Sequence, residues 1–252
     1  MKNLGLIGFP LGHSFSQQFF TDKFKKLNVN CSYNNYELDD LSQLKKLIFD
    51  YQLTGLNVTS PYKTSIIPHL DQVELTAQTV GSVNTILIKD KKLIGYNTDI
   101  IGFQKSLERL IGDQIPPTLI LGTGGSAKAV AFVLKQKNIS FQYVSRNANE
   151  DAISYNQAND RISQNLLIIN CTPIGRFPDI HLSPPLNYFK LTDKHILFDL
   201  NYNPKITAFM AEGIKKGCMV CNGYEMLTEQ AGILRYQYLI ACFAPLNYVK
   251  KA

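Results

Sequence analysis

The sequence predicts an α/β protein with two lobes, and two observations support this prediction. Short apolar runs typical of strands alternate with helical patterns almost throughout the chain, which favours an α/β fold with a largely parallel sheet. The chain has 252 residues, which at about 150 residues per domain corresponds to one large domain or two modest ones. A new α/β series begins after the turn-rich stretch 112–117, so we place the junction of two lobes near residue 100.

The first lobe contains five apolar runs that we interpret as strands. These runs are 4–8, 31–37, 55–59, 83–88 and 93–96. Apolar residues recur at helical spacing after each of the first two runs, which predicts two helices. These residues are Phe15, Phe19, Phe24, Leu27, Leu41, Leu44, Leu47 and Ile48. The polar stretch 89–92 between the last two runs predicts a hairpin.

The second lobe starts with a helical pattern at 99–111 and then repeats the alternation of strand and helix. Its expected strands are 118–121, 140–145, 166–170, 195–200 and 218–221. A helix is expected at 126–136. Three prolines between 176 and 187 predict a surface loop there.

Composition and charge narrow the class of partner. Lys and Arg total 26 against 20 Asp and Glu, a net charge of +6 that is scattered along the chain. A mild excess of this kind suits anionic small molecules at least as well as nucleic acid. Glycine and proline interrupt the long apolar runs, so we expect neither a membrane span nor a secretory signal. We therefore expect a small-molecule substrate, no nucleic acid and no membrane partner.

The five cysteines are too few and too odd in number for a disulfide scaffold. Cys218 and Cys221 form a C-x-x-C, but apolar residues separate them and no second pair stands at metal-ligand spacing. We interpret them as small hydrophobic residues of a buried strand rather than as a redox pair or half of a zinc site. Free thiols fit a reducing compartment, so we expect a cytoplasmic protein without a bound metal.

A glycine-rich turn joins an apolar run to a helical pattern within 118–136. Gly122, Gly124 and Ala127 occupy the G-x-G-x-x-A positions of the dinucleotide-binding fingerprint. Gly122 permits a tight turn, and Gly124 lets the backbone approach a pyrophosphate that the helix N-terminus attracts. In this context of strand, turn and helix we favour dinucleotide binding over a purely structural turn.

The residue after the next expected strand bears on the choice of dinucleotide. Sites for NAD place an acidic side chain there, about 20 residues beyond the turn, to bind the ribose hydroxyls. This chain has Arg146, whose guanidinium is suited to a 2′-phosphate. We therefore favour NADP over NAD, the alternative being a solvated surface arginine.

Four short polar motifs of the first lobe are hard to explain as core. They are 12–16, 57–63, 83–85 and 97–99. The first two follow expected strands, and ligands of open α/β sheets bind at the carboxyl ends of strands. Each motif also has a structural interpretation, because Ser14 and Asp99 are suited to cap helices and Asn57 and Asn97 to form turns.

Taken together, these motifs resemble those of the shikimate dehydrogenase family over nearly the whole chain. The matching segments of the first lobe are 8–16 (G-x-P-x-x-H-S-x-S), 57–63 (N-V-T-x-P-x-K), 83–85 (V-N-T) and 97–102 (N-T-D-x-x-G). Those of the second lobe are 122–128, 170–175, 199–204 and 222–231. So many spaced motifs in one order are a specific signal.

The resemblance implies reversible reduction of 3-dehydroshikimate to shikimate by NADPH, within aromatic amino acid biosynthesis. Lys63 and Asp99 match the family's catalytic pair, and a lysine held by a carboxylate can polarise a carbonyl and relay a proton. The residues implied to bind the substrate are Ser14, Ser16, Asn57, Thr59, Asn84, Tyr202 and Gln230. Those implied to bind NADP(H) are Gly122, Gly124, Gly125, Ser126, Ala127, Arg146, Thr172 and Gly223.

The resemblance also implies the division of the chain. It predicts a substrate-binding and catalytic domain at 1–100 and an NADP-binding domain of Rossmann type at 101–226, with a C-terminal helix at 227–252 returning to the first domain. The expected assembly is a monomer or a homodimer. The chain departs from the family pattern at Gln17, at the neighbours of Arg146 and at Arg176, and the last two departures bear on cofactor affinity and on the choice of NADP.

Three other functions are alternatives to this hypothesis. A quinate/shikimate dehydrogenase that uses NAD or both cofactors shares almost all the motifs, and Arg146 without an acidic neighbour disfavours it. A non-catalytic nucleotide-binding module would not need the pair Lys63 and Asp99. A dehydrogenase of the tetrahydrofolate type lacks support from the serine pair and from the motif around Gln230.

Overall fold

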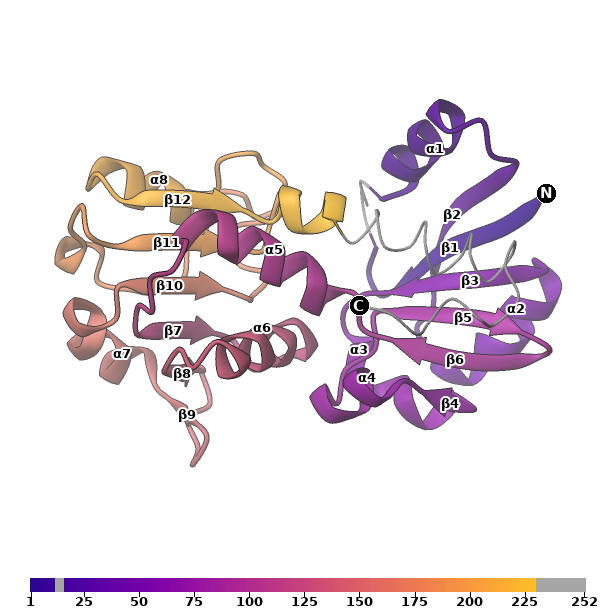
Figure 1. The fold of residues 1–252 in the computed structure, drawn as a ribbon, viewed down its shortest axis with the longest axis horizontal. Helices are drawn as coiled ribbons and strands as arrows, with labels where there is room; N and C mark the ends of the chain where they lie inside the picture. The colour runs from indigo at the N-terminus through magenta and orange to yellow at the C-terminus, as the bar shows by residue number, and fades with distance from the viewer. Residues whose placement is uncertain (12–15, 230–252) are drawn as a thin grey trace. The chain divides into compact units, whose positions relative to one another are not determined.

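The computed structural model describes residues 1–11 and 16–229 of the chain. The described residues form two compact units, 1–98 and 99–229 (Figure 1). Each unit is built on a six-stranded sheet of its own. The predicted α/β fold class with two sheets is confirmed.

The first sheet has the strand order β2-β1-β3-β5-β6-β4. Its strands are β1 (Lys2–Gly8), β2 (Cys31–Glu37), β3 (Leu53–Val58), β4 (Gln72–Val73), β5 (Thr85–Lys89) and β6 (Lys92–Tyr96). β1 runs parallel to both its neighbours, whereas β5 is antiparallel to β3 and to β6. The sheet is therefore mixed rather than largely parallel, because β5 and β6 form the predicted hairpin. Asp90 and Lys91 at its tip both have positive φ, as two-residue hairpin turns require.

Four α-helices accompany this sheet in the described residues. They are α1 (Ser16–Lys26), α2 (Leu44–Asp50), α3 (Tyr62–Ser65) and α4 (Leu75–Val80), with the 3₁₀ turns η1 (Leu41–Gln43) and η2 (Ile67–His69). The sequence analysis did not predict α3, β4 or α4. A local signal for α4 exists, since Glu74 caps its first turn and Gly81 ends it in the left-handed conformation.

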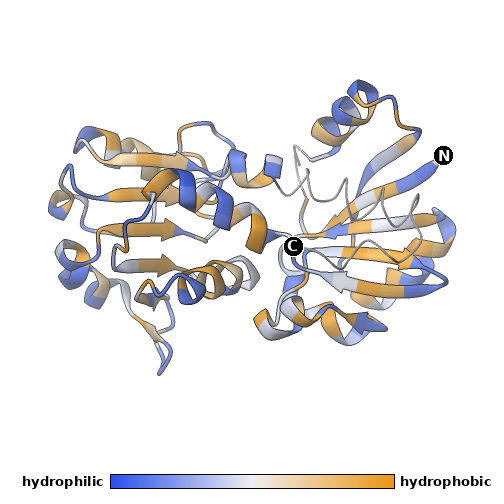
Figure 2. Cartoon of the chain, viewed as in Figure 1, coloured by the Kyte–Doolittle hydropathy of each residue, from blue (hydrophilic) through white to orange (hydrophobic). Residues whose placement is uncertain are grey.

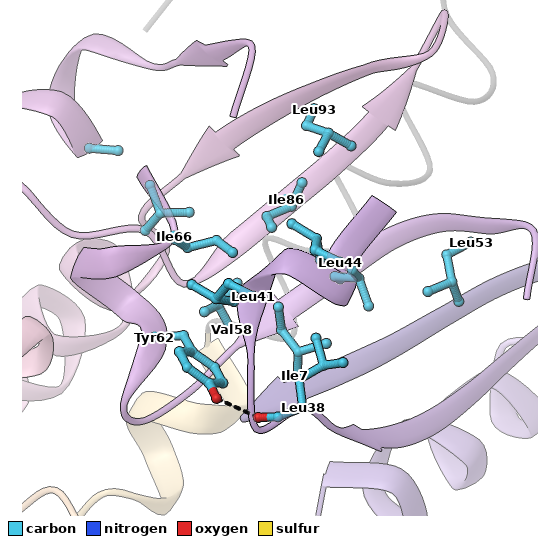
Figure 3. Packing of buried hydrophobic residues seen from close by; sticks show 13 residues of the cluster. Ile7, Leu38, Leu41, Leu44, Leu53, Val58, Tyr62, Ile66, Ile86 and Leu93 are labelled. Atoms are coloured by element: carbon cyan, nitrogen blue, oxygen red, sulfur yellow. Dashed lines mark hydrogen bonds between the residues drawn. The ribbon is translucent and has the colours of Figure 1, made fainter. Parts of the chain in front are cut away.

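The first sheet buries apolar side chains on both faces, because successive residues of a strand point to opposite sides. Leu4 and Leu6 of β1 pack with Phe20 and Tyr33 in one cluster. Ile7 packs in another cluster with residues that follow β2, such as Leu38, and with side chains of α2 and β3 (Figure 3). The Tyr62 hydroxyl donates a hydrogen bond to the Leu38 carbonyl at the edge of this cluster.

The second sheet is entirely parallel, in the order β12-β11-β10-β7-β8-β9. Its strands are β7 (Thr118–Leu121), β8 (Phe141–Val144), β9 (Ala152–Ile153), β10 (Leu167–Asn170), β11 (Ile196–Asp199) and β12 (Met219–Asn222). The central strands β7, β10 and β11 are buried at every residue. They are largely apolar (Figure 2), as expected of strands covered on both faces.

The α-helices of the second unit are α5 (Asp99–Ile111), α6 (Gly125–Gln136), α7 (Tyr155–Arg161) and α8 (Ala208–Lys215), with the turns η3 (Ile162–Gln164) and η4 (Tyr188–Lys190). α5 packs against α6, and α8 packs against β11 and β12. The rings of Phe103 on α5 and Phe198 on β11 meet edge to face, with 5.4 Å between their centroids. Residues 224–229 are helical, and Glu229 bonds to Lys105 and Arg109 of α5. Most of the C-terminal helix predicted at 227–252 lies outside the described residues.

The C-x-x-C segment differs from its predicted surroundings. β12 is an edge strand rather than a buried one, and Met219 between the two cysteines is 51% exposed. Cys218 and Cys221 are both free thiols. Burial raises the pKa of Cys218 and raises that of Cys221 to about 11, so neither forms a reactive thiolate readily at neutral pH.

Candidate active site

The segments that directly follow β1 and β3 lie side by side at the carboxyl edge of the first sheet. β1 and β3 are parallel neighbours in which Ile7 pairs with Val58. Beyond the paired residues, Thr59 N donates to Ile7 O at 2.9 Å and Phe9 N donates to Ser60 O at 3.1 Å. The segments that follow the two strands therefore leave the sheet together, at the position where α/β sheets bind ligands.

Asn57 lies near the end of β3 with its side-chain amide engaged on both sides. The Tyr33 hydroxyl of β2 donates to Asn57 Oδ1 at 2.8 Å. Asn57 Nδ2 lies 3.4 Å from both Asn84 O and Thr85 Oγ1. The structure thus brings together Asn57 and Asn84, two residues that the resemblance assigns to the substrate.

Asn84 is buried and tied to the residue before Asp99. Thr98 N donates to Asn84 Oδ1 at 2.8 Å, and Asn84 Nδ2 donates to Thr98 Oγ1 at 3.0 Å. Asp99 follows directly as the first residue of α5 and is 2% exposed. A carboxylate at a helix N-terminus interacts favourably with the helix dipole, which helps to offset the cost of burying Asp99.

Lys63 lies on the short helix α3 and is only partly exposed. Its carbonyl accepts a hydrogen bond of 2.7 Å from Val83 N, the residue before Asn84. The backbone at 83–84 therefore anchors both the segment that carries Lys63 and the Thr98 residue that precedes Asp99. Thr59 begins the turn into α3, since its carbonyl accepts from Tyr62 N at 3.0 Å.

Four further substrate-binding residues were predicted from the sequence. Ser16 is buried as the first residue of α1. Tyr202 is half-buried and belongs to the second unit, in the loop after β11. Ser14 and Gln230 lie outside the described residues.

The glycine-rich turn of the second unit has the predicted form of strand, turn and helix. β7 ends at Leu121, and α6 begins at Gly125. Gly122 has φ +98°, a left-handed conformation in which a Cβ would lie 3.1 Å from Thr172 Cγ2. At Gly124 a Cβ would meet nothing within 4 Å. Ala127 is fully buried and Ser126 lies beside it in the first turn of α6.

The space beside Gly124 is open at the N-terminus of α6. A helix N-terminus presents free backbone N–H groups and the positive end of its dipole to an anion. Gly124 leaves room in front of α6 for a phosphate to approach the backbone. Arg146 is exposed after β8, the strand next to β7, where a 2′-phosphate would require a cation.

A polar network joins the ends of β10 and β11. No role was predicted for it from the sequence. Asp199 is fully buried and accepts from Thr207 Oγ1 at 2.6 Å and from Asn170 Nδ2 and Asn201 N at 3.0 Å each. Burial raises the pKa of Asp199 to about 6, although these donors oppose the shift. The local signal for Asp199 is its position at the end of an apolar strand. An acidic residue at such a position is either buried or lies at the edge of the sheet where ligands bind.

The network holds the turn that contains Thr172. Asn170 Oδ1 accepts from Thr172 N at 3.0 Å and from Thr172 Oγ1 at 2.6 Å. Asn201 Nδ2 donates to Thr172 O at 3.0 Å. The turn is thus bonded to the loop that continues to Tyr202.

Gly223 lies at the carboxyl edge of the second sheet, directly after β12. A Cβ there would lie 2.0 Å from the Leu200 carbonyl oxygen, so the close approach of the two segments requires glycine. The predicted residues Gly122, Thr172 and Gly223 therefore all lie at the carboxyl edge of the second sheet. In the described residues no group of three His, Cys, Asp or Glu side chains is arranged to hold a metal, and no helix there is long and apolar enough to cross a membrane.

Comparisons with known proteins agree with the geometry. Residues 6–86 match the family described as the shikimate dehydrogenase substrate binding domain. A shikimate dehydrogenase (NADP(+)) of Methanosphaera stadtmanae is 34% identical over 246 residues, which cover 90% of this chain and 87% of that protein. Shikimate dehydrogenase 1 from Peptoclostridium difficile superposes with a TM-score of 0.85 at 33% identity, covering 95% of this chain and 92% of that one. The shikimate 5-dehydrogenase of Thermus thermophilus in complex with NADP(H) and shikimate superposes with a TM-score of 0.82 at 29% identity, covering 94% and 93%.

Proposed function

Because the chain belongs to the shikimate dehydrogenase family, we propose that Lys63 and Asp99 carry the proton relay of its reaction. The activity is the reversible, NADP-dependent oxidation of shikimate to 3-dehydroshikimate in aromatic amino acid biosynthesis. The family, the oxidoreductase class and the NADP(H) cofactor predicted from the sequence are confirmed. The roles of individual residues remain our proposal.

The observation that supports these roles is the pair of bonds at residues 83–84. Val83 N holds the carbonyl of Lys63, and Asn84 holds Thr98, which precedes Asp99. In the direction of reduction, Lys63 Nζ donates a proton to the carbonyl oxygen of the substrate as negative charge develops on it. Asp99 orients the ammonium, and water restores the proton after the transfer.

The second unit holds the cofactor in this proposal. NADPH supplies the hydride that is transferred to the carbonyl carbon. The backbone at Gly122, Gly124 and Gly125, together with Ser126 and the first turn of α6 that contains Ala127, binds the pyrophosphate. Arg146 binds the 2′-phosphate, and Thr172 and Gly223 shape the nicotinamide side.

The first unit supplies most of the groups that recognise the substrate. Shikimate carries a carboxylate and three hydroxyls, so its site needs many neutral hydrogen-bonding groups. We assign the hydroxyls to Asn57, Thr59 and Asn84. Gln230 joins them in recognising the hydroxyls and the carbonyl, and Ser14 and Ser16, with Tyr202 nearby, bind the carboxylate. Buried groups of this kind reject analogues that lack a hydroxyl, because the protein groups are then left unpaired.

We also propose a cellular location, an assembly state and a domain division for the enzyme. We place it in the cytoplasm, acting as a monomer or a homodimer on small molecules. The domain that binds substrate corresponds to 1–100 and the one that binds NADP to 101–226, with 227–252 associated with the first domain. Arg146 favours NADP-linked shikimate oxidation over the alternative of quinate oxidation with NAD.

Formation of reduced cofactor tests the proposal. Wild-type protein and Lys63→Ala are assayed with shikimate or quinate, each with NADP⁺ or NAD⁺. We expect turnover chiefly with shikimate and NADP⁺, and a fall in kcat of about 100- to 10,000-fold for Lys63→Ala. Lys45→Ala, which removes an exposed lysine of α2, serves as the control and should retain wild-type activity. Equal kcat values for the wild type and Lys63→Ala would disprove the role of Lys63.

A further inference from the structure

We propose that Tyr33 is a positioning residue for substrate recognition, because its hydroxyl orients the side-chain amide of Asn57. The inference rests on the proposed role of Asn57 in binding shikimate. Tyr33 lies on β2, and Asn57 lies on β3, with β1 between the two strands. The motifs that indicate the site do not include Tyr33.

The strand register explains how a residue two strands away reaches the site. Leu4 of β1 pairs with Tyr33, and Leu6 pairs with Asn57. Residues two apart on a strand point to the same face, so Tyr33 and Asn57 project from the same face of the sheet. β2 and β3 are about 10 Å apart across β1, a span that a tyrosine and an asparagine side chain bridge together. Their contact is the 2.8 Å hydrogen bond from the Tyr33 hydroxyl to Asn57 Oδ1.

The Tyr33 ring is held firmly enough to orient its partner. Its side chain is buried, with an exposed fraction of 4%. The ring stacks on that of Phe20 from α1, with centroids 4.4 Å apart and an interplanar angle of 19°. Leu4 and Leu6 complete the apolar surroundings, so the hydroxyl is presented from a packed cluster with little rotational freedom.

The partners of the Asn57 amide select one of its two orientations. With Oδ1 toward Tyr33, Nδ2 faces Asn84 O and Thr85 Oγ1 at 3.4 Å each. The reversed amide would place its own carbonyl oxygen against the Asn84 carbonyl oxygen, two acceptors with no proton between them. The observed orientation is therefore the stable one, and the Tyr33 hydroxyl occupies one acceptor position of Oδ1.

This orientation determines what Asn57 offers to a ligand. Its N–H groups lie on the side of Asn84, the other amide that we assign to the substrate. The bonds that Nδ2 makes there are long for an N–H donor, so a substrate oxygen competes well for them. Asn57 therefore recognises an acceptor oxygen of shikimate. Without the Tyr33 hydroxyl this preference is weaker, and the amide donates to the substrate in a smaller fraction of the molecules.

A double-mutant cycle tests the coupling, with KM for shikimate and KM for NADP⁺ measured in the full chain. Tyr33→Phe should raise KM for shikimate about 3- to 10-fold, as loss of one positioned hydrogen bond implies, and leave KM for NADP⁺ unchanged. In an Asn57→Ala background, Tyr33→Phe should have no further effect on KM for shikimate. Additive effects, or equal increases in both KM values, would show that Tyr33 acts only through general stability and would overturn the proposal.

Two further variants keep the test decisive. Tyr188→Phe removes another tyrosine hydroxyl that donates to a carbonyl, that of Pro184, in the second unit, and it should lower stability without changing KM for shikimate. Asn57→Asp keeps an acceptor for Tyr33 but has no N–H, so wild-type KM in Asn57→Asp would overturn the proposal even if Tyr33→Phe failed to fold. A wild-type protein that did not oxidise shikimate at all would instead contradict the proposed function, so the two failures are distinguishable.

Discussion

Replacing Asp199 with asparagine tests whether burial in the second unit destabilises the ionised form of the Asp199 carboxyl group. Asp199 is fully buried at the end of β11, and burial raises its pKa from 3.8 to about 6. Asparagine has the same shape and keeps an oxygen for the donors Asn170 Nδ2 and Asn201 N. It has no carboxyl group to titrate. The comparison therefore isolates the cost of ionising this one side chain in the folded state.

The size of the effect follows from the shift in pKa. A carboxyl whose pKa is higher in the folded state contributes stability below the unfolded pKa, and this contribution is lost as pH rises through the folded pKa. Between about pH 4 and about pH 7, a shift from 3.8 to about 6 removes about 2 kcal/mol from the free energy of unfolding of the wild type. Asp199→Asn has no such loss. The variant should therefore gain about 2 kcal/mol relative to the wild type over this range.

Urea denaturation followed by far-ultraviolet circular dichroism measures this difference at a series of pH values. Any constant cost of the substitution, such as a poorer bond to Thr207, cancels because only the change with pH is compared. Asp113→Asn, which removes an exposed carboxylate in the turn after α5, is the matched control. A difference between Asp199→Asn and the wild type that stays flat, or that falls as pH rises, would refute the reasoning.

Three other substitutions probe the ligand edge of the second sheet. Gly223→Ala should lower the free energy of unfolding by at least about 2 kcal/mol, because its Cβ would lie 2.0 Å from the Leu200 carbonyl oxygen; wild-type stability in urea would contradict this. Gly124→Ala places its methyl where nothing lies within 4 Å, so stability should change by less than about 1 kcal/mol. Its Kd for NADPH, measured by calorimetry, should rise at least about 10-fold because the methyl obstructs the pyrophosphate; unchanged affinity would place the cofactor elsewhere. Arg146→Ala should raise KM for NADP⁺ about 10-fold or more and leave KM for NAD⁺ unchanged, and a parallel rise in both would exclude 2′-phosphate recognition.

Local patterns in the sequence predict the elements that position the site. They do not predict whether a strand is central or at the edge of its sheet, because this depends on strand order. The apolar runs that became β1, β3, β7 and β10 are recognisable because most of their residues are buried, and the polar motifs follow directly from their ends. The segment at 218–221 has the same apolar composition, yet it forms an edge strand with Met219 exposed. Whether a strand is central depends on which strands pair with it, and this is a long-range property that its own residues do not encode.

The same limit explains why local sequence patterns show polar residues at the ends of strands but not which residue of another strand holds each of them in place. Asn57 and Asn170 both stand out as amides at the ends of strands. The residues that orient them lie 24 and 29 positions away, at Tyr33 and Asp199. Each contact exists only because the sheet order brings β2 within reach of β3 across β1, or sets β11 beside β10. In both units a buried donor or acceptor from another strand bonds one end of such an amide. A substitution of Tyr33 should therefore alter recognition while leaving every residue of the family motifs intact.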